Sequence, residues 1–364
     1  MNVVIACGGT GGHLFPGLAV AEVLRQRGHQ TLLFISEKEI DNLAVRDHQE
    51  QFRFEKLPSI GLPRIFSPAM VGFVRGFGHS VNLCRAYYRE FQPHAVLGMG
   101  GFTSTGPLLA GCLARVPTFI HESNAIPGKA NRLNAKLAKA VLLGFAECTR
   151  FFPRNRCEVT GTPIRADLRV PTDKAAALLA FGFDPASRKP TLLVMGGSQG
   201  AHGINRAVTK ALPVLKDLVQ IIHLTGRDDE QYTRETYAEA GAQAFVAAFH
   251  HRMQDAYAAA DLAIARSGAA SLSELASFGL PSLLIPYPHA AEDHQTFNAR
   301  IFEAAGASVL LKEGEVADAR LANTVAAILQ DNGKLKAMSA ATRRLAPDDA
   351  ASRLADILEK ERPA

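Results

Sequence analysis

The 364-residue sequence lacks the cysteine patterns of a disulfide framework or a zinc site. Its cysteines are Cys7, Cys84, Cys112, Cys148 and Cys157. The number is odd, and no two are spaced as Cys-x-x-Cys. Such a set is typical of reduced thiols in a cytosolic protein. We therefore expect neither a structural disulfide nor a metal site.

Long apolar runs are also missing. A membrane-spanning helix needs about 20 consecutive apolar residues, and no stretch approaches that length. The opening run Val3–Cys7 is too short for the core of a signal peptide and lacks a small-residue cleavage site. Any membrane contact is therefore expected to be peripheral. We also find no low-complexity segment and no repeat of solenoid period.

The composition is that of an ordinary globular protein with a basic balance. Hydrophobic residues make up 47% and charged residues 21%, and the length favours two domains. The net charge is +5 and the pI is about 9.0. This charge favours an anionic partner, namely phosphate groups, nucleic acid or an acidic lipid surface. A mildly basic enzyme without surface preference is the alternative.

Apolar runs that alternate with amphipathic stretches predict a parallel sheet in the first half. The expected strands are Val3–Cys7, Thr31–Ile35, Ala95–Gly98, Thr118–Ile120 and Val141–Leu143. A glycine loop follows the first run, and a helix then extends to about Gly28, with Pro16 in its first turn. Continuous apolar strands with helices between them are typical of parallel sheets covered on both faces.

The same alternation restarts after the connector at 161–165. The expected strands are Leu192–Met195, Val219–Leu224, Ala244–Ala247, Leu262–Ala265, Ser282–Pro286 and Ser308–Leu311. The fold class is therefore α/β, with two Rossmann-like doubly wound parallel-sheet domains that face a shared cleft. We expect domains at 1–161 and 162–345. We expect residues 346–364 to form a carboxyl-terminal helix that can pack back on the first domain.

Each half opens with a strand, a glycine turn and a helix. The turns are Gly8-Gly9-Thr10-Gly11-Gly12 and Gly196-Gly197-Ser198-Gln199-Gly200. Glycines let a backbone approach phosphate, and a helix start offers N–H groups and partial positive charge. Neither turn fits G-x-G-x-x-G, because Leu14 stands at the third glycine position of the first turn and Gln199 at the second glycine position of the other, and no Gly-Lys-Ser/Thr follows. Two such turns favour phosphate binding over the alternative that they are merely tight turns.

Three other segments carry polar groups near expected strand ends. His13 follows the first glycine turn and suits a general base or a phosphate donor, although a packing role is the alternative. The segments Gly98–Thr103 and His121–Gly128 each follow a strand and can line a ligand crevice. For the second of these, a turn chosen for backbone geometry is the alternative.

The most specific local pattern is the small, polar turn at 266–271, which opens a helix. Its helix start can hold a diphosphate, and Glu274 can accept hydrogen bonds from two ribose hydroxyls. An exposed helical glutamate is the alternative. Further on, His289, His294, Gln295 and Asn298 offer the donors and acceptors that sugar hydroxyls need.

The segment 64–89 combines apolar residues with arginines and has no acidic residue. Its members include Arg64, Ile65, Phe66, Met70, Val71, Phe73, Val74, Arg75, Phe77, Arg85 and Arg89. This composition suits an interfacial helix on anionic lipid. An ordinary core helix and a mobile acceptor loop are the alternatives.

Taken together, these motifs resemble the MurG family of bacterial UDP-GlcNAc transferases over nearly the whole chain. The matching elements are Gly8–His13 with Phe15–Ala19, Gly98–Gly101, His121-Glu122, Gly196–Gly200, Arg266–Ala269 and Ser273-Glu274. The resemblance implies a GT-B glycosyltransferase fold, a metal-independent inverting hexosyltransferase and no cofactor. The implied partners are UDP-GlcNAc, a lipid-linked muramyl-peptide and an anionic membrane surface, and not nucleic acid.

The reaction implied by this resemblance moves GlcNAc to the C4 hydroxyl of MurNAc in undecaprenyl-pyrophosphoryl-MurNAc-peptide. This step converts lipid I to lipid II in peptidoglycan synthesis, at the cytoplasmic face of the cell membrane. The first domain would bind the acceptor and the membrane, and the second would bind UDP-GlcNAc. Alternatives are another GT-B glycolipid glycosyltransferase, a UDP-sugar epimerase, an NAD-dependent dehydrogenase or a non-catalytic nucleotide-sugar sensor.

The resemblance also assigns roles to single residues. Those implied to bind the donor are Thr10, Gly11, Gly12, Asn124, Arg165, Ser198, Phe249, Ser271, Glu274, His294 and Gln295. Those implied to bind the acceptor are Gly9, Thr10, His13, Gly101, Phe102 and Glu122, with His13 also the candidate base. The membrane contacts would be Phe66, Phe73, Val74, Arg75 and Phe77. Ser123, His294 and Phe102 depart from the family pattern, where Gln, Gln and Tyr are common.

Overall fold

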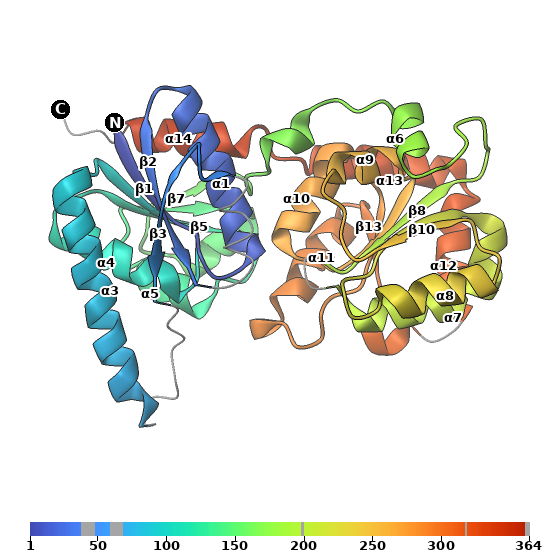
Figure 1. Cartoon of the computed structure of the whole chain (residues 1–364), viewed down its shortest axis with the longest axis horizontal. Helices are drawn as coiled ribbons and strands as arrows, with labels where there is room; N and C mark the ends of the chain where they lie inside the picture. The colour runs from blue at the N-terminus through green and yellow to red at the C-terminus, as the bar shows by residue number, and fades with distance from the viewer. Residues whose placement is uncertain (38–47, 59–67, 198–199, 317–318, 361–364) are drawn as a thin grey trace. The chain divides into compact units, whose positions relative to one another are not determined.

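The computed structural model describes residues 1–37, 48–58, 68–197, 200–316 and 319–360. The chain forms two compact units. Unit 1 comprises Met1–Arg165 and Pro347–Ala364, and unit 2 comprises Ala166–Ala346. Figure 1 shows that each unit has a central sheet with helices on its faces.

Unit 1 contains a seven-stranded parallel sheet in the order β3-β2-β1-β4-β5-β6-β7. The strands are β1 (Asn2–Ala6), β2 (Gln30–Ser36), β3 (Arg53–Leu57), β4 (Ala95–Gly98), β5 (Thr118–Glu122), β6 (Ala140–Leu143) and β7 (Cys157–Val159). Val4 of β1 pairs with Leu32 of β2 on one side and with Val96 of β4 on the other. The strand order therefore reverses between β1 and β4, and the carboxyl ends of these strands flank the usual ligand crevice.

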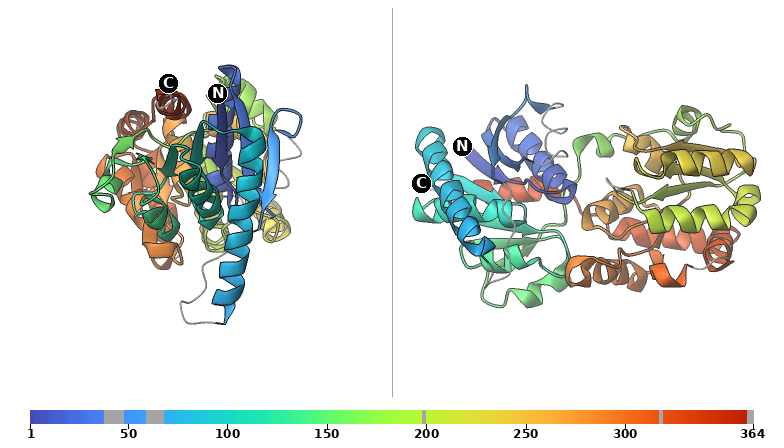
Figure 2. Two further views of the ribbon diagram at one scale, coloured as in Figure 1. Left: turned by 90° about the vertical axis from the view of Figure 1, so that its left-hand side faces the viewer. Right: turned by 60° about the horizontal axis from the view of Figure 1, so that its bottom comes forward.

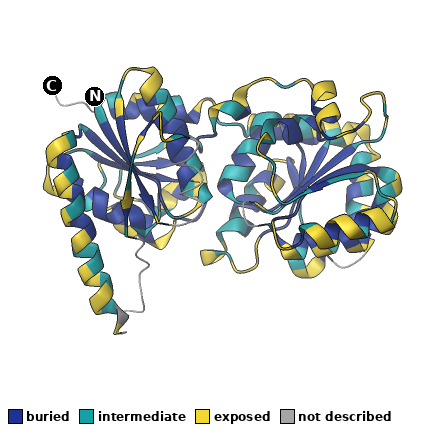
Figure 3. Cartoon of the chain, viewed as in Figure 1, coloured by how far each residue is buried: buried dark blue, intermediate teal, exposed yellow. Residues whose placement is uncertain are grey.

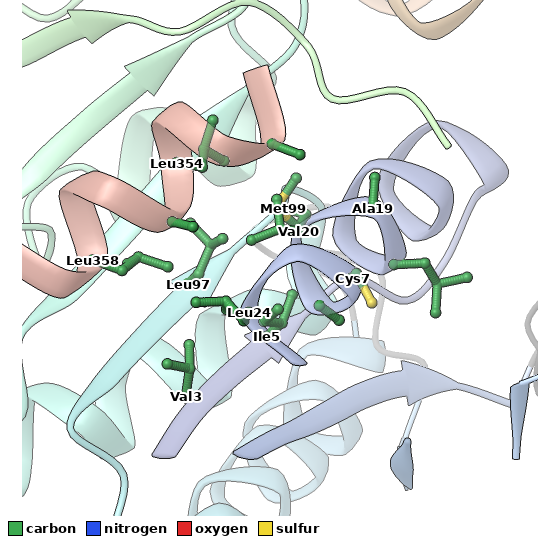
Figure 4. Close-up of a cluster of buried hydrophobic side chains, with 14 of the residues drawn as sticks. Val3, Ile5, Cys7, Ala19, Val20, Leu24, Leu97, Met99, Leu354 and Leu358 are labelled. Atoms are coloured by element: carbon green, nitrogen blue, oxygen red, sulfur yellow. The ribbon is translucent and has the colours of Figure 1, made fainter. Parts of the chain in front are cut away.

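Helices cover both faces of the unit 1 sheet. The helices are α1 (Gly11–Gln26), α3 (Ala69–Phe91), α4 (Thr105–Leu113), α5 (Lys129–Asn134) and α14 (Ala350–Lys360), with 3-10 turns η1 (Phe102–Ser104) and η2 (Ala146–Phe151). On one face Val3 and Ile5 pack with Leu24 of α1 and with Leu354 and Leu358 of α14 (Figure 4). On the other face, side chains of α3 and α4 cover Val4 and Ala6. The last helix thus completes the core of the first unit.

Unit 2 contains a six-stranded parallel sheet in the order β10-β9-β8-β11-β12-β13. The strands are β8 (Thr191–Met195), β9 (Gln220–Leu224), β10 (Ala244–Ala247), β11 (Leu262–Ala265), β12 (Ser282–Leu284) and β13 (Ser308–Leu310). The order reverses between β8 and β11, which makes their carboxyl ends the switch point of this sheet. Figure 3 shows that the strands of both units are buried while the outer faces of α3 and α8 are exposed.

The helices of unit 2 also lie on both sides of the sheet. They are α6 (Lys174–Ala180), α7 (His202–Leu218), α8 (Glu230–Glu239), α9 (Met253–Ala259), α10 (Ala269–Phe278), α11 (His294–Ala304), α12 (Ala319–Leu329) and α13 (Asn332–Arg344), with 3-10 turns η3 (Ala166–Arg169), η4 (Ala291–Asp293) and η5 (Glu313–Glu315). Buried residues of α7 and α12, such as Val208 and Val325, pack on Leu192 and Ile264 of the sheet. Among the described helices, none has both the length and the apolarity needed to cross a membrane.

The prediction of two doubly wound parallel sheets is confirmed, but the position of Pro16 is wrong. Helix α1 begins at Gly11, so Pro16 lies inside the helix and not in its first turn. The helix begins earlier than predicted because Gly11 and Gly12, which were expected in the loop, already have helical conformation. Their backbone N–H groups therefore stand at the helix start, directly after β1 and Thr10.

Candidate active site

In unit 1 the glycine turn at 8–12 and the segment Gly98–Thr103 meet at the switch point, and His13 lies between them. A Cβ placed on Gly100 would stand 2.7 Å from Nε2 of His13, and one on Gly101 would stand 3.5 Å from Nδ1. Both glycines have positive φ, +117° and +71°. These positions therefore require glycine for the backbone and, at Gly100, also to leave room for the imidazole.

His13 is the third residue of α1, whose start offers a favourable site for an anion. Oγ1 of Thr10 lies 3.2 Å from Nδ1 of His13. The first turn of α1 contains no acidic residue, and Gly12 is exposed while Gly11 is half-buried. Backbone N–H groups and the helix dipole together favour negative charge at such a start. A Cβ on the predicted acceptor residue Gly9 would be 3.6 Å from Oγ1 of Thr103, so Gly9 lies beside η1.

The carboxylate of Glu122 organises the loop that follows β5. Its Oε1 accepts from the backbone N–H of Asn124 at 3.0 Å and from the Asn124 side-chain amide at 3.2 Å. Its Oε2 accepts from the N–H of Gly128 at 3.0 Å and from the Asn131 amide at 2.9 Å. Burial raises the pKa of Glu122, and these hydrogen bonds oppose that rise. These four donors come from residues 124–131, so Glu122 shapes the loop that carries Asn124.

His121 is a buried neutral histidine next to this loop. Its Nε2–H donates to the carbonyl of Gly161 at 2.9 Å, and the hydroxyl of Ser123 lies 3.3 Å from Nδ1. Burial lowers the pKa of His121 to about 4. The hydrogen bonds fix one tautomer, in which Nδ1 is the acceptor. The loop is thus held from both sides, by Glu122 and by His121.

Two other predicted residues of unit 1 make aromatic contacts. The guanidinium of Arg165 lies 5.2 Å from the centre of the Phe15 ring. Phe102 meets Phe73 of α3 edge-on with ring centres 6.5 Å apart, and Phe73 stacks on Phe77 at 6.1 Å. The structure therefore joins a predicted acceptor residue to two predicted membrane residues in one aromatic group.

In unit 2 a buried polar network lies against Gly200, the last residue of the glycine segment after β8. A Cβ on Gly200 would stand 2.2 Å from the carbonyl oxygen of Thr225, so the two backbones touch. Asn205 of α7 donates to that same carbonyl at 2.8 Å and accepts at Oδ1 from Nε2–H of His223 at 3.0 Å. The hydroxyl of Tyr237 in turn donates to Nδ1 of His223 at 2.8 Å. Burial lowers the pKa of His223 to about 3.

The turn after β11 opens α10, and Glu274 lies in the second turn of that helix. Gly268 is the N-cap residue, and Ser271 is half-buried in the first turn. The hydroxyl of Tyr257 on α9 donates to Oε2 of Glu274 at 2.5 Å. Tyr257 itself is buried. The tyrosine therefore fixes the direction of a carboxylate that the sequence assigns to the ribose.

Helix α11 brings the predicted sugar-binding residues against the same turn. The hydroxyl of Ser267 donates to the carbonyl of Gln295 at 2.8 Å, and the amide of Asn298 donates to the carbonyl of Ser267 at 3.1 Å. Oε1 of Gln295 accepts from the N–H of Tyr287 at 3.0 Å. The ring of His294 donates to the carbonyl of Ala291 at 2.7 Å. Hydrogen bonds through Ser267 thus connect Gln295 to the turn that opens α10.

The predicted site residues divide between the two units. Unit 1 holds Gly9, Thr10, Gly11, Gly12, His13, Gly101, Phe102, Glu122, Asn124 and Arg165. Unit 2 holds Phe249, Ser271, Glu274, His294 and Gln295. Phe249 is 53% exposed and its ring lies 5.2 Å from that of His251. Ser198 and Phe66 lie outside the described residues. The part of the chain that the structure describes contains no cluster of three or more His, Cys, Asp or Glu suited to a metal ion.

Comparison with known proteins defines the class of this chain. The family model of the glycosyltransferase family 28 N-terminal domain matches residues 3–143. The model of the glycosyltransferase family 28 C-terminal domain matches residues 191–358. The sequences around both switch points are therefore those of a family 28 glycosyltransferase.

Full-length relatives narrow the class to one family. The UDP-N-acetylglucosamine–N-acetylmuramyl-(pentapeptide) pyrophosphoryl-undecaprenol N-acetylglucosamine transferase of Syntrophotalea carbinolica is 40% identical, over 97% of each chain. The crystal structure of Acinetobacter baumannii MurG has a TM-score of 0.77 and 27% identity, over 99% of each chain. The chain belongs to the MurG family of transferases. UDP-GlcNAc 2-epimerase of Neisseria meningitidis, bound to UDP-GlcNAc, shares the fold alone, with a TM-score of 0.71 and 14% identity over 99% of this chain and 100% of that one.

Proposed function

We propose that this protein transfers GlcNAc from UDP-GlcNAc to the C4 hydroxyl of MurNAc in a lipid-linked muramyl-peptide. The conversion is that of lipid I to lipid II, and it inverts the anomeric carbon. The observation that carries the proposal is the family membership over the whole chain, together with a glycine turn at each switch point. Two anion-favouring turns suit two substrates that each contain a diphosphate.

The donor site of this proposal lies in unit 2. The starts of α7 and α10 supply N–H groups for the diphosphate, with Ser198 and Ser271 beside it. Glu274, oriented by Tyr257, accepts hydrogen bonds from the ribose. The exposed Phe249 region holds the uracil, and His294 and Gln295 read the sugar hydroxyls. The family resemblance also assigns Asn124 and Arg165 of unit 1 to the donor.

The acceptor site lies at the start of α1 in unit 1. Residues 9–13 and Gly101 bind the acceptor diphosphate, and His13 takes the proton of the C4 hydroxyl as that oxygen attacks C1 of GlcNAc. The C1–O bond to UDP breaks as the new glycosidic bond forms, so the leaving group gains negative charge. Helix starts stabilise that charge electrostatically. In this scheme Glu122 acts on the acceptor through the loop that it shapes.

We further infer that α3 rests on the cytoplasmic face of the membrane as a peripheral contact. Val71 is 65% exposed and Val74 is 59% exposed, and Arg75 is exposed beside them. In Figures 1 and 2 the amino-terminal turns of α3 extend beyond the unit 1 sheet. Apolar side chains flanked by arginine suit an anionic lipid surface. The aromatic group of Phe73, Phe77 and Phe102 links this helix to the acceptor turn.

A transfer assay tests the function. Radiolabelled UDP-GlcNAc is incubated with a lipid-linked muramyl-peptide in the presence of EDTA, and the label is expected to appear in the lipid fraction. A parallel incubation without lipid tests the epimerase alternative. Label that stays in water-soluble products in both incubations, with an isomerised sugar, would replace the proposal by the epimerase. Label that stays in unchanged UDP-GlcNAc would favour a sensor that binds the donor without transfer.

A further inference from the structure

Arg266 is a buried cation that contacts carbonyl, carboxylate and aromatic groups of unit 2. It directly follows β11, and only 9% of its side chain is exposed. Its Nη1 donates to the carbonyls of Ile285 and Pro286, at 3.0 Å each, just after β12. Its Nη2 lies 2.5 Å from Oε2 of Glu313, and its guanidinium lies 5.5 Å from the Tyr287 ring centre. The guanidinium thus joins the carboxyl ends of neighbouring strands.

Glu313 extends this connection to the other side of the switch point. It is the first residue of η5, after β13, and its carboxylate lies directly over Gly203 in the first turn of α7. A Cβ on Gly203 would stand 2.2 Å from Oε1 of Glu313. Only glycine therefore leaves room for the carboxylate at this place. Arg266 follows β11, its carbonyl partners follow β12, Glu313 follows β13, and Gly203 lies in the helix that follows β8. The Arg266–Glu313 ion pair therefore connects segments that follow four strands of the sheet.

We propose that Glu313 is a positioning residue of the donor site, acting through Arg266 and Gly203. The Arg266–Glu313 pair holds the starts of α7 and α10 at a fixed separation, so that both can bind one diphosphate. This role deepens the proposed function and rests on it. The guanidinium of Arg266 is bound to two carbonyls and a carboxylate of the protein. In this arrangement Arg266 therefore serves to fix the backbone of the turn at 266–268.

Two substitutions disturb the pair in different ways. Glu313→Gln removes the charge and keeps the shape of the side chain. Gly203→Ala keeps both charges but displaces the carboxylate, which is the flexible end of a side chain and can move away. Glu315→Gln and Gly314→Ala are the matched controls. Glu315 is 42% exposed and lies 3.6 Å from Arg320, and a Cβ on Gly314 meets nothing within 4 Å.

The experiment measures the affinity for UDP by calorimetry and for uridine by competition, with thermal unfolding recorded for each variant. We expect both Glu313→Gln and Gly203→Ala to weaken UDP binding about tenfold, the scale of one charge-assisted contact. Uridine, which lacks phosphates, should bind as in the wild type, and both controls should leave the UDP affinity unchanged. Equal losses for UDP and uridine would indicate a merely structural role and overturn the proposal. Unchanged or tighter UDP binding would overturn it as well.

UDP binding by the wild-type protein distinguishes a failure of this inference from a failure of the proposed function. If wild-type protein fails to bind UDP, the donor assignment itself is wrong. If it binds UDP and the two variants bind UDP equally well, only the role of Glu313 is lost. If Glu313→Gln unfolds, Gly203→Ala carries the test, because it retains both charged groups.

Discussion

His13 owes its position to glycines that lie far away in the sequence. Because a Cβ on Gly100 would overlap the imidazole, Gly100→Ala should displace the proposed base without removing it. We expect His13→Ala and Gly100→Ala each to lower kcat by about 10²–10⁴-fold. UDP affinity should change little, since the donor contacts lie mainly in unit 2. Steady-state kinetics with the lipid acceptor and calorimetry with UDP check both expectations.

Gly28→Ala is the matched control for the backbone strain that Gly100→Ala introduces. Its φ is +80°, and an added Cβ there meets nothing within 4 Å. Gly28→Ala should therefore cost about 1 kcal/mol of stability and leave turnover unchanged. Turnover that stays normal in His13→Ala would remove this histidine from the role of base.

Glu274 and Tyr257 should act as a pair on the donor. Glu274→Ala removes the carboxylate that is proposed to bind the ribose, at a loss of about 1.5–3 kcal/mol of binding free energy. Tyr257→Phe removes only the hydroxyl that orients Oε2, so we expect a smaller rise in KM for UDP-GlcNAc with kcat unchanged. Calorimetry and initial-rate kinetics measure these effects. Equal UDP-GlcNAc affinity in Glu274→Ala and the wild type would refute the ribose assignment.

At this scale, the sequence predicts the residues of the turns but not their partners. The 266–271 turn and Glu274 stand in one continuous motif, so their pattern was visible. Tyr257 and Glu313 lie on other elements and have no motif of their own. A tyrosine on a short helix and a glutamate after a strand are common, and only the folded sheet brings them to the site.

Among the elements, the central strands were predictable and two edge strands were not. The central strands β4 and β11 match their predicted bounds because each is a short apolar run between turns, and the apolar edge strand β10 of unit 2 does so for the same reason. β3 has the sequence RFEKL and β7 has CEV, and both lie at edges of the unit 1 sheet. Edge strands face solvent on one side and need no continuous apolar pattern. Because β3 and β7 lack such a pattern, hydrophobic periodicity does not find these two strands.

Helix α3 should determine membrane affinity. Val74→Glu places a negative charge in the exposed apolar surface, and repulsion from anionic lipid should cost about 1 kcal/mol, or roughly fivefold in affinity. Co-sedimentation with phosphatidylglycerol vesicles measures this loss. Val214→Glu is the control, because Val214 is 49% exposed on α7 of unit 2. Equal losses in both variants would show that net charge, and not α3, sets the affinity.

The whole molecule should lose stability in acid through one buried histidine in each unit. Burial lowers the pKa of His121 to about 4 and that of His223 to about 3, from an ordinary value of 6.5. Below about pH 6.5 the unfolded chain binds protons that the folded chain does not. The stability that each buried neutral histidine contributes is therefore fully present above that pH. The free energy of unfolding falls as pH falls, by about 2 kcal/mol per histidine at pH 5.

Denaturant unfolding at about pH 7.5 and pH 5 measures this dependence. The raised pKa of Glu122 acts in the opposite direction, since a carboxyl that prefers its proton when folded loses stability as pH rises. The difference between wild type and His223→Gln isolates one histidine, and the variant should show the weaker pH dependence. Identical pH dependence in the two proteins would contradict the prediction.

The order of the segments along the chain determines which unit can complete its fold first during synthesis. Helix α14 supplies Leu354 and Leu358 to the core beneath β1, although the ribosome makes these residues after all of unit 2. Until then α1 alone covers this apolar face of the first sheet, and the area under α14 stays exposed, while unit 2 can already fold completely. Unit 1 begins before unit 2 in the chain, yet it completes its core after unit 2 can fold. A premature stop codon after unit 2 would leave the exposed face available to chaperones and proteases.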